Sequence, residues 1–315
     1  MKIRQQGVAL LVVLWACTLL AILVGGFASI ARVEALQTRF TLGQQRARYA
    51  AEAGIMRGIA TIDARRRQAV LAEMSDVPPS GAGLPGDGRS LAFDFDGMHV
   101  AVGIQDENGK VDINSADSRT LQALFIAAGC ADSRATALRR RVEASRGMVG
   151  APVADDGTSA TPRLASQEPP NTPARRPVPF AAVEELQALP GMDPALYGRI
   201  EPAITIWSGR QTPQPEFAPL LAMATLRGLD LESARAVIAA RDGAPPGTPL
   251  QNLPGGLALG DALPGRAITF RALADDGHGS RSLVEATVLF AVAVPERDPR
   301  QSLYTIVRWR DGPPG

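Results

Sequence analysis

The sequence is short of the residues that most often build catalytic and metal sites. Its 315 residues include two cysteines, Cys17 and Cys130, and two histidines, His99 and His278. Cys17 lies in an apolar N-terminal run and Cys130 in the body of the chain, so we expect no intramolecular disulfide, and no cluster has zinc-site spacing. A nucleophile elbow, a phosphate-binding loop and a metal triad are also missing. These absences indicate a protein that is not an enzyme.

An excess of charge of either sign is also missing. The 33 lysines and arginines balance 32 aspartates and glutamates, for a formal net charge of +1, and hydrophobic residues make up 45% of the chain. A domain that binds nucleic acid through its phosphates is usually basic. The composition is therefore that of a globular protein, with enough residues for one large core or two modest domains.

Charged residues are absent from residues 8–31, which read VALLVVLWACTLLAILVGGFASIA after the leader MKIRQQG. As an α-helix this run is about 36 Å long, enough to cross a hydrocarbon core of about 30 Å. Lys2 and Arg4 precede the run, which places the N-terminus in the cytoplasm. A cleaved signal peptide ending at residues 29–31 is the alternative, but the run is longer than the apolar region of such peptides. The sequence predicts one membrane-spanning helix with most of the mass on the far side.

Proline is absent from residues 32–74, where good helix formers dominate. We therefore expect the helix to continue over residues 32–75 with an amphipathic outer half. Arginines recur every seven residues on a second face, at Arg32, Arg39 and Arg46. The predicted apolar stripe consists of Leu36, Phe40, Tyr49, Ala53, Met56 and Ile59.

Strand patterns occur in two separate blocks, at about residues 90–112 and 266–310. In the first block, alternating apolar residues flank Asp96-Gly97, a strong two-residue hairpin signal. In the second, two β patterns flank the turn sequence ADDGHGS, and residues 303–309 form a final strand. Asp106-Glu107-Asn108-Gly109 indicates a turn, with an isolated acidic site as the alternative.

Between these blocks a helical pattern occurs three times, each copy with a glycine between two helices, at Gly129, Gly191 and Gly228. Glycine suits the left-handed residue that ends a helix. Asp193 and Asp230 are placed to cap the next helices, with proline following Asp193 at the first helical position. The segment therefore indicates repeated helix–hairpin–helix units.

The N-terminus resembles the precursors of type IV pilin-like proteins, which have a basic leader ending in glycine and then an uninterrupted apolar helix. The resemblance implies that a prepilin peptidase cuts after Gly7 and methylates Val8. The fifth mature residue in that family is usually a glutamate that meets a neighbour's N-terminal amine, whereas here it is Val12. Within the family, minor pseudopilin K of type II secretion lacks this glutamate.

The rest of the chain resembles the same family, the general secretion pathway protein K family. DENGKVDINSADSRTLQALF resembles its transition from strand to inserted helices, and LVEATVLFAVA and LYTIVRWR resemble its closing strands. The implied fold class is α+β: a pilin-like fold, with a long helix on a small antiparallel sheet, and a large inserted all-α domain of helix–hairpin–helix or SAM-like repeats. The expected divisions are leader 1–7, transmembrane and assembly helix 8–31, amphipathic helix 32–75, first β part 76–112, helical insert 113–244 with a mobile loop at 147–179, and second β part 245–315.

The resemblance implies a non-catalytic function at the tip of a periplasmic pseudopilus that exports folded proteins across the outer membrane. A helical insert of this size would obstruct the stacking of identical subunits, which favours the tip. The implied partners are the I- and J-type minor pseudopilins, a major pseudopilin, the prepilin peptidase and the inner-membrane assembly platform. The implied location is the inner membrane of a Gram-negative bacterium, with the bulk in the periplasm.

Two questions stay open in the sequence. The family can carry calcium, but its ligands cannot be mapped here, and Asp155-Asp156 and Asp275-Asp276 are better explained as turn residues. The alternative function is that of a membrane-anchored helix–hairpin–helix protein that binds DNA. Against it, Ala131, Asp193 and Asp230 replace the second glycine of the DNA-binding pattern, and a carboxylate there would repel a phosphate. Nucleic acid is therefore not expected as a partner, and the hairpins are expected to pack helices.

Overall fold

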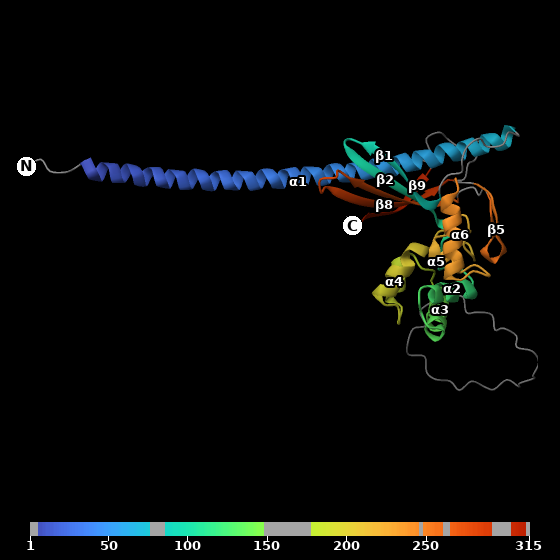
Figure 1. The fold of residues 1–315 in the computed structure, drawn as a ribbon. Helices are drawn as coiled ribbons and strands as arrows, with labels where there is room; N and C mark the ends of the chain where they lie inside the picture. Colours follow the sequence, from blue (N-terminus) through green and yellow to red (C-terminus); the bar gives the residue numbers. More distant parts are fainter. Residues whose placement is uncertain are drawn as a thin grey trace, which may run out of the picture.

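The computed structural model describes residues 6–75, 86–147, 178–245, 248–260, 265–291 and 304–312. A long helix runs along one face of an antiparallel sheet, and a body of short helices lies on the other side (Figure 1). The leader residues 1–5 lie outside the described residues. So does almost all of the loop predicted at 147–179, including Asp155-Asp156.

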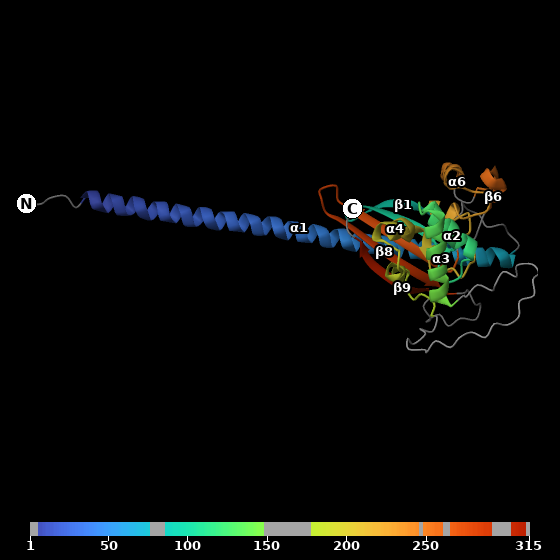
Figure 2. The same cartoon turned by 90° about the horizontal axis from the view of Figure 1, so that it is seen from below.

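Helix α1 (Gln6–Ser75) is continuous over 70 residues. Its N-terminal half extends alone, away from the rest of the molecule, in both views (Figures 1 and 2). Within the described residues it is the one helix long and apolar enough to cross a membrane. The unbroken helix follows from the absence of proline and from the good helix formers that continue past the apolar run.

The C-terminal half of α1 packs on the sheet through a face other than the predicted one. Of the predicted apolar stripe only Ile59 is buried, whereas Tyr49 is 66% and Met56 42% exposed. The buried face consists of Ala47, Ala50, Ala51, Ile55, Ile59 and Ile62. The prediction was wrong because the buried face contains several alanines, which contribute little to a hydrophobic pattern in the sequence. Their small side chains nevertheless let the helix approach the sheet closely.

The sheet has the strand order β1-β2-β7-β8-β9, with each neighbouring pair antiparallel. Its strands are β1 (Asp87–Phe95), β2 (Met98–Asp106), β7 (Ala267–Asp275), β8 (Arg281–Phe290) and β9 (Tyr304–Gly312). The turn between β1 and β2 is the predicted one, because Asp96 and Gly97 have φ values of 49° and 74°. β2 and β7 are paired neighbours, so the chain between them leaves the sheet and returns to the adjacent position.

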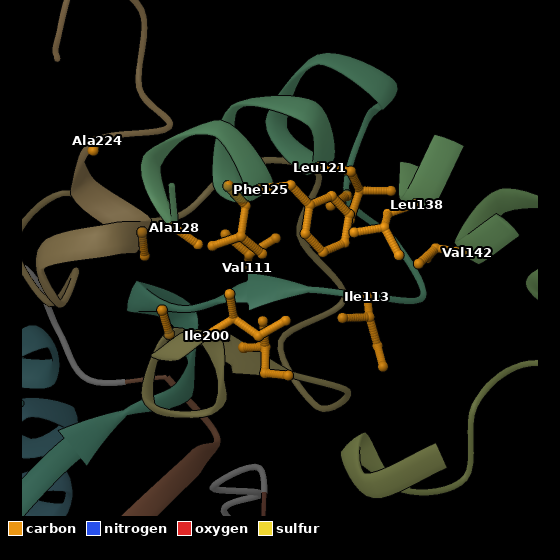
Figure 3. Close-up of a cluster of buried hydrophobic side chains, with 14 of the residues drawn as sticks. Val111, Ile113, Leu121, Phe125, Ala128, Leu138, Val142, Ile200 and Ala224 are labelled. Atoms are coloured by element: carbon orange, nitrogen blue, oxygen red, sulfur yellow. The ribbon is translucent and has the colours of Figure 1, made fainter. Parts of the chain in front are cut away.

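The helical body lies between β2 and β7 in the sequence. Its hydrophobic core is separate from the core between α1 and the sheet, and it is filled by large side chains such as Leu121, Phe125 and Leu138 (Figure 3). Its elements are η1 (Glu107–Gly109), β3 (Val111–Asp112), α2 (Ser118–Ala127), α3 (Asp132–Arg146), η2 (Val183–Ala188), α4 (Pro194–Ile200), η3 (Glu201–Ala203), β4 (Ile204–Thr205), α5 (Leu220–Met223), α6 (Leu231–Gly243), β5 (Leu250–Leu253), η4 (Pro254–Gly256) and β6 (Leu257–Leu259).

The hairpin β5–β6 lies with the helical body and not with the main sheet. The two strands form a sheet of their own, and Leu250, Leu253, Leu257 and Leu259 pack on the helical core. Residues 250–259 were expected within the second β part, 245–315. These residues form strands, and their leucines pack against the helical core.

Candidate functional site

The predicted processing site lies at the free end of α1. Gly7 and Val8 are in the first turn of the helix, and Val12, where the pilin-like family has its glutamate, is 58% exposed. The large apolar side chains between Leu10 and Ile30 are exposed along the same segment. Burying apolar surface is favourable by about 25 cal/mol per Å², so this segment needs a lipid bilayer or other helices around it. The segment is therefore a long helix with an exposed apolar surface.

The three predicted hairpin glycines lie in the helical body, far along the chain from the free end of α1. Gly129, Gly191 and Gly228 have φ values of 91°, 85° and 78°, the left-handed region that glycine adopts without a Cβ penalty. Helices α3, α4 and α6 begin shortly after them. The structure does not bring these glycines together with Gly7, Val8 or Val12 into one site.

At the turn around Gly191, the polar groups are bonded to other groups of the chain itself. Asp193 Oδ1 accepts a hydrogen bond from the backbone N–H of Leu196 at 2.7 Å, and its other oxygen pairs with Arg134 at 2.5 Å. The ion pair and the cap hold the pKa of Asp193 below its usual value. Arg134 also donates to Gly191 O and Arg141 to Pro190 O, so arginines of α3 cover the turn carbonyls. The backbone N–H of Leu196, in the first turn of α4, is therefore occupied by a carboxylate of the chain itself.

The other two turns differ in their capping. Asp230 caps α6 by accepting from the backbone N–H of Ser233 at 2.8 Å, as its position in the sequence predicted, and this bond lowers its pKa. Gly228 lies against Gly255, where an added Cβ would be 3.5 Å from the neighbouring Cα. At the first turn, Ala131 provides no side-chain cap for α3. Two of the three helix starts are therefore closed by the chain's own carboxylates.

The segment KVDINSAD holds the helical body together at its beginning. Buried Asp112 accepts hydrogen bonds from the backbone N–H groups of Asn114 and Gly209, both at 2.8 Å. The Asn114 side chain bonds both backbone groups of Phe180, and Arg146 donates to the carbonyl groups of Ile113 and Ala116. These polar residues have structural partners, which explains why a short polar motif stands next to a hydrophobic core.

A buried acidic pair marks the junction between the sheet and the helical body. Asp106 and Glu107, at the end of β2, are both 0% exposed. Asp106 accepts from the backbone N–H of Asn108 at 2.8 Å and from that of Gly265. Burial raises the pKa of Asp106 to about 6, because desolvation outweighs these hydrogen bonds. The sequence indicated a turn here, and a short 3-10 helix is present, but it gave no signal that both carboxyl groups are buried.

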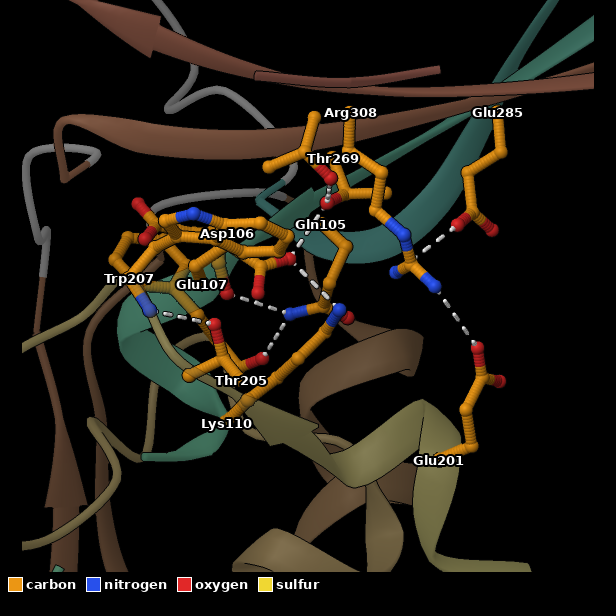
Figure 4. Close-up of polar contacts among 12 residues, drawn as sticks. Gln105, Asp106, Glu107, Lys110, Glu201, Thr205, Trp207, Thr269, Glu285 and Arg308 are labelled. Atoms are coloured by element: carbon orange, nitrogen blue, oxygen red, sulfur yellow. Dashed lines mark hydrogen bonds and ion pairs between the residues drawn. The ribbon is translucent and has the colours of Figure 1, made fainter. Parts of the chain in front are cut away.

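Glu107 connects the two parts through polar contacts. Its Oε1 accepts from Lys110 Nζ at 2.7 Å and from the Thr269 hydroxyl at 2.6 Å, and Thr269 also bonds the Thr287 hydroxyl (Figure 4). Next to it, Gln105 Nε2 donates to the carbonyl oxygen of Phe217 at 2.8 Å. The sheet therefore presents polar groups to the helical body and apolar groups to α1.

A cluster of charges extends this junction to the C-terminal strand. Arg310 Nη2 contacts Glu201 at 2.8 Å and Glu285 at 2.7 Å. Arg308, also on β9, pairs with Glu184 of η2. Burial alone would lower the pKa of Arg310, but the bonds to Glu201 and Glu285 outweigh it and raise the pKa. We call these five side chains the junction cluster.

Within the described residues, no group of three histidine, cysteine, aspartate or glutamate side chains could hold a metal ion. Asp276, in the turn before β8, accepts hydrogen bonds from Ser280 and from the backbone N–H of His278, and these lower its pKa to about 2. Asp275 pairs with Arg281 at 2.5 Å. Both carboxylates thus have partners within the turn and at the start of β8.

The fold belongs to the α+β class, with a long N-terminal helix packed on an antiparallel sheet and an additional helical region. The model of the family described as type II secretion system (T2SS), protein K, matches residues 98–209. One chain of the crystal structure of the GspK-GspI-GspJ complex from the enterotoxigenic Escherichia coli type 2 secretion system is similar over 86% of this chain and 99% of that chain, with 13% identity and a TM-score of 0.45. A comparison with curated proteins found no match.

Proposed function

We propose that this chain is a non-catalytic minor pseudopilin that caps the tip of the periplasmic pseudopilus and helps to initiate its assembly. In this function α1 is anchored in the inner membrane of a Gram-negative bacterium, and the sheet and helical body lie in the periplasm. The secretion system then exports folded proteins across the outer membrane. The match of residues 98–209 to the protein K family model and the exposed apolar half of α1 support this proposal.

The observation that carries the tip position is the placement of the helical body. It projects from the side of the sheet that faces away from α1 (Figure 1). In a fibre of identical subunits that stack through their helices, each subunit has neighbouring subunits on several sides. A subunit with so large a helical body fits best at the tip of the fibre, where no further subunit is added above it.

Val12 supports the same position. A subunit below can present its own glutamate to the Val8 amine of this chain. A subunit above would find no carboxylate here, because the side chain at this position is apolar. A lone charge in the membrane costs about 3 kcal/mol on insertion scales, so an end subunit benefits from valine at this place.

The partners follow from the same proposal. Protein K of the Escherichia coli complex is found with GspI and GspJ. We infer corresponding I- and J-type partners for this chain, a major pseudopilin below them, the prepilin peptidase that processes the leader, and the inner-membrane platform. The helix–hairpin–helix units serve to pack helices in this proposal. Capping by Asp193 and Asp230 supports that role over DNA binding.

Processing tests the pilin-like part of the proposal. We expect the membrane-extracted chain to begin at Val8, as read by N-terminal sequencing or intact mass. Gly7→Val should block cleavage, because a side chain before the cut would not fit the peptidase. Gly25→Val is the matched control, since an added Cβ there meets nothing within 4 Å. A mature chain beginning at Met1 or Arg32 would contradict the proposal.

Labelling of assembled fibres tests the tip position. We expect immunogold particles against this chain at one end of each pseudopilus, with the I and J types copurifying. Val12→Glu should bring no gain in secretion, since no subunit lies above to use the carboxylate. Regular labelling along the fibre would show that the chain is a shaft subunit.

A further inference from the structure

Three arginines of helix α1 have no side-chain partner among the described residues. Within the part of the molecule that the structure describes, Arg32, Arg39 and Arg46 form no ion pair or hydrogen bond through their side chains. The residues three and four positions away from each of them are all uncharged. The chain therefore leaves a row of positive charges on α1, spaced by seven residues.

The arginines further along α1 behave differently. Arg48 pairs with Glu52 at 3.1 Å, Arg57 lies over the Phe93 ring at 4.2 Å, and Arg67 pairs with Asp63 at 2.6 Å. Arg66 donates to the carbonyl oxygen of Gly265 at 2.7 Å. The contrast indicates that the row at 32, 39 and 46 is directed to a group outside this chain.

An exposed apolar seam runs beside this row. Leu42, Tyr49 and Met56 are also spaced by seven residues, and they are 48%, 66% and 42% exposed. If they are taken as heptad positions a, the three arginines fall at positions e. A repeat of seven follows the left-handed supercoil of a coiled coil, in which charges at e and g select the partner helix.

We propose that this face of α1 binds a partner α-helix that runs parallel to it and carries aspartate or glutamate at every seventh residue. In parallel pairs, e positions of one helix face g positions of the other, so the acidic residues belong at g. The proposal rests on the proposed function, because the parallel direction follows from anchoring both helices in the same membrane. It adds the charge pattern by which the partner is recognised.

A lipid headgroup is a weaker explanation of the row. Arg32 follows the apolar run directly, but Arg39 and Arg46 lie about 10 and 21 Å further along the helix. The headgroup layer on one side of a bilayer is only about 5–8 Å thick. A second copy of this chain also fits poorly, since the acidic residues of α1 in this region, Glu34, Glu52 and Asp63, do not occur at seven-residue intervals.

Two synthetic probes test the proposal with the full chain in nanodiscs of zwitterionic lipid. The probes are four-heptad helical peptides with identical apolar residues at a and d, and with glutamate or lysine at every g. We expect the glutamate peptide to bind about fivefold more tightly by fluorescence anisotropy, with the difference lost in high salt. The double variant Arg39→Glu and Arg46→Glu should reverse the preference.

The matched control is the double variant Arg140→Glu and Arg227→Glu, which makes the same change in net charge at exposed positions of the helical body. It should keep the preference for the glutamate peptide. Equal binding of both peptides, an unchanged preference in the Arg39/Arg46 variant, or binding that requires anionic lipid would each overturn the inference. Cleavage after Gly7 in the same preparations reports on the proposed function separately.

Discussion

The core between α1 and the sheet and the core of the helical body differ in how their elements approach one another. In the first, alanines and glycines of α1 lie directly on the sheet, so that an added Cβ at Gly54 would be 2.8 Å from Val100 Cγ1. In the second, leucines and phenylalanines fill the space between short helices. One interface depends on close approach and the other on large side chains.

Polar contacts connect the sheet to the helical body. Glu107, Thr269, Gln105 and the junction cluster form hydrogen bonds and ion pairs between the sheet and the helical body. The partly exposed ion pairs of the junction cluster contribute less than apolar packing and respond to salt. The comparison teaches that α1 and the sheet form one tightly packed unit, and that the helical body is attached to it by directional polar bonds.

The largest expected effect comes from emptying one core at a time. Phe125→Ala should destabilise the helical body by about 3–5 kcal/mol, because it leaves a cavity where a fully buried ring was. Hydrogen exchange read by mass spectrometry should show α2 and α3 losing protection while β2 and β7 keep theirs. Phe270→Ala should have the reverse pattern. Equal loss of protection in both parts after either change would show a single cooperative core.

A smaller effect is expected from filling the close approach of α1. Gly58→Leu should destabilise the protein by about 1–3 kcal/mol in denaturant titrations, because its Cβ alone would be 2.7 Å from Phe270 Cδ1. Gly198→Ala in α4 is the control, since its Cβ meets nothing within 4 Å. That change should stabilise by about 0.5–1 kcal/mol. A neutral Gly58→Leu variant would show that α1 can move off the sheet without cost.

The smallest effect concerns the junction cluster. A double-mutant cycle of Arg310→Gln and Glu201→Gln should give a coupling energy of about 0.5–1 kcal/mol at low salt, since both side chains are partly exposed. The coupling should shrink in 1 M NaCl, where the Debye length is about 3 Å. Arg227→Gln, exposed on the helical body, should change stability by less than about 0.5 kcal/mol. A coupling that does not change with salt would mean that packing, not charge, joins the two parts.

Much of the local structure could be predicted because its signals lie within a few residues. The turn at Asp96-Gly97 needs positive φ at both positions, and aspartate and glycine tolerate it. Asp193 and Asp230 cap the helices that start after them, as short polar side chains at such positions do. The strands of the two β blocks were recognisable from their alternation.

The arrangement of these elements was not predictable in the same way. The face of α1 that packs on the sheet was misjudged because Tyr49 and Met56 are more hydrophobic than Ala47 and Ala51, and only the sheet decides which of them it can accommodate. The leucines of β5 and β6 pack on the helical core, although residues 250–259 were expected within the second β part.

The sequence by itself determined the long apolar helix, the hairpin turns and the capped helix starts, because these depend on backbone preferences and on neighbours along the chain. Only the tertiary structure decided the burial of Asp106 and Glu107 and the pairing of Arg310 with Glu201. The partners of these groups come from segments far away in the sequence. Their contacts depend on the partners that folding brings to them, and the raised pKa of Asp106 depends on its burial.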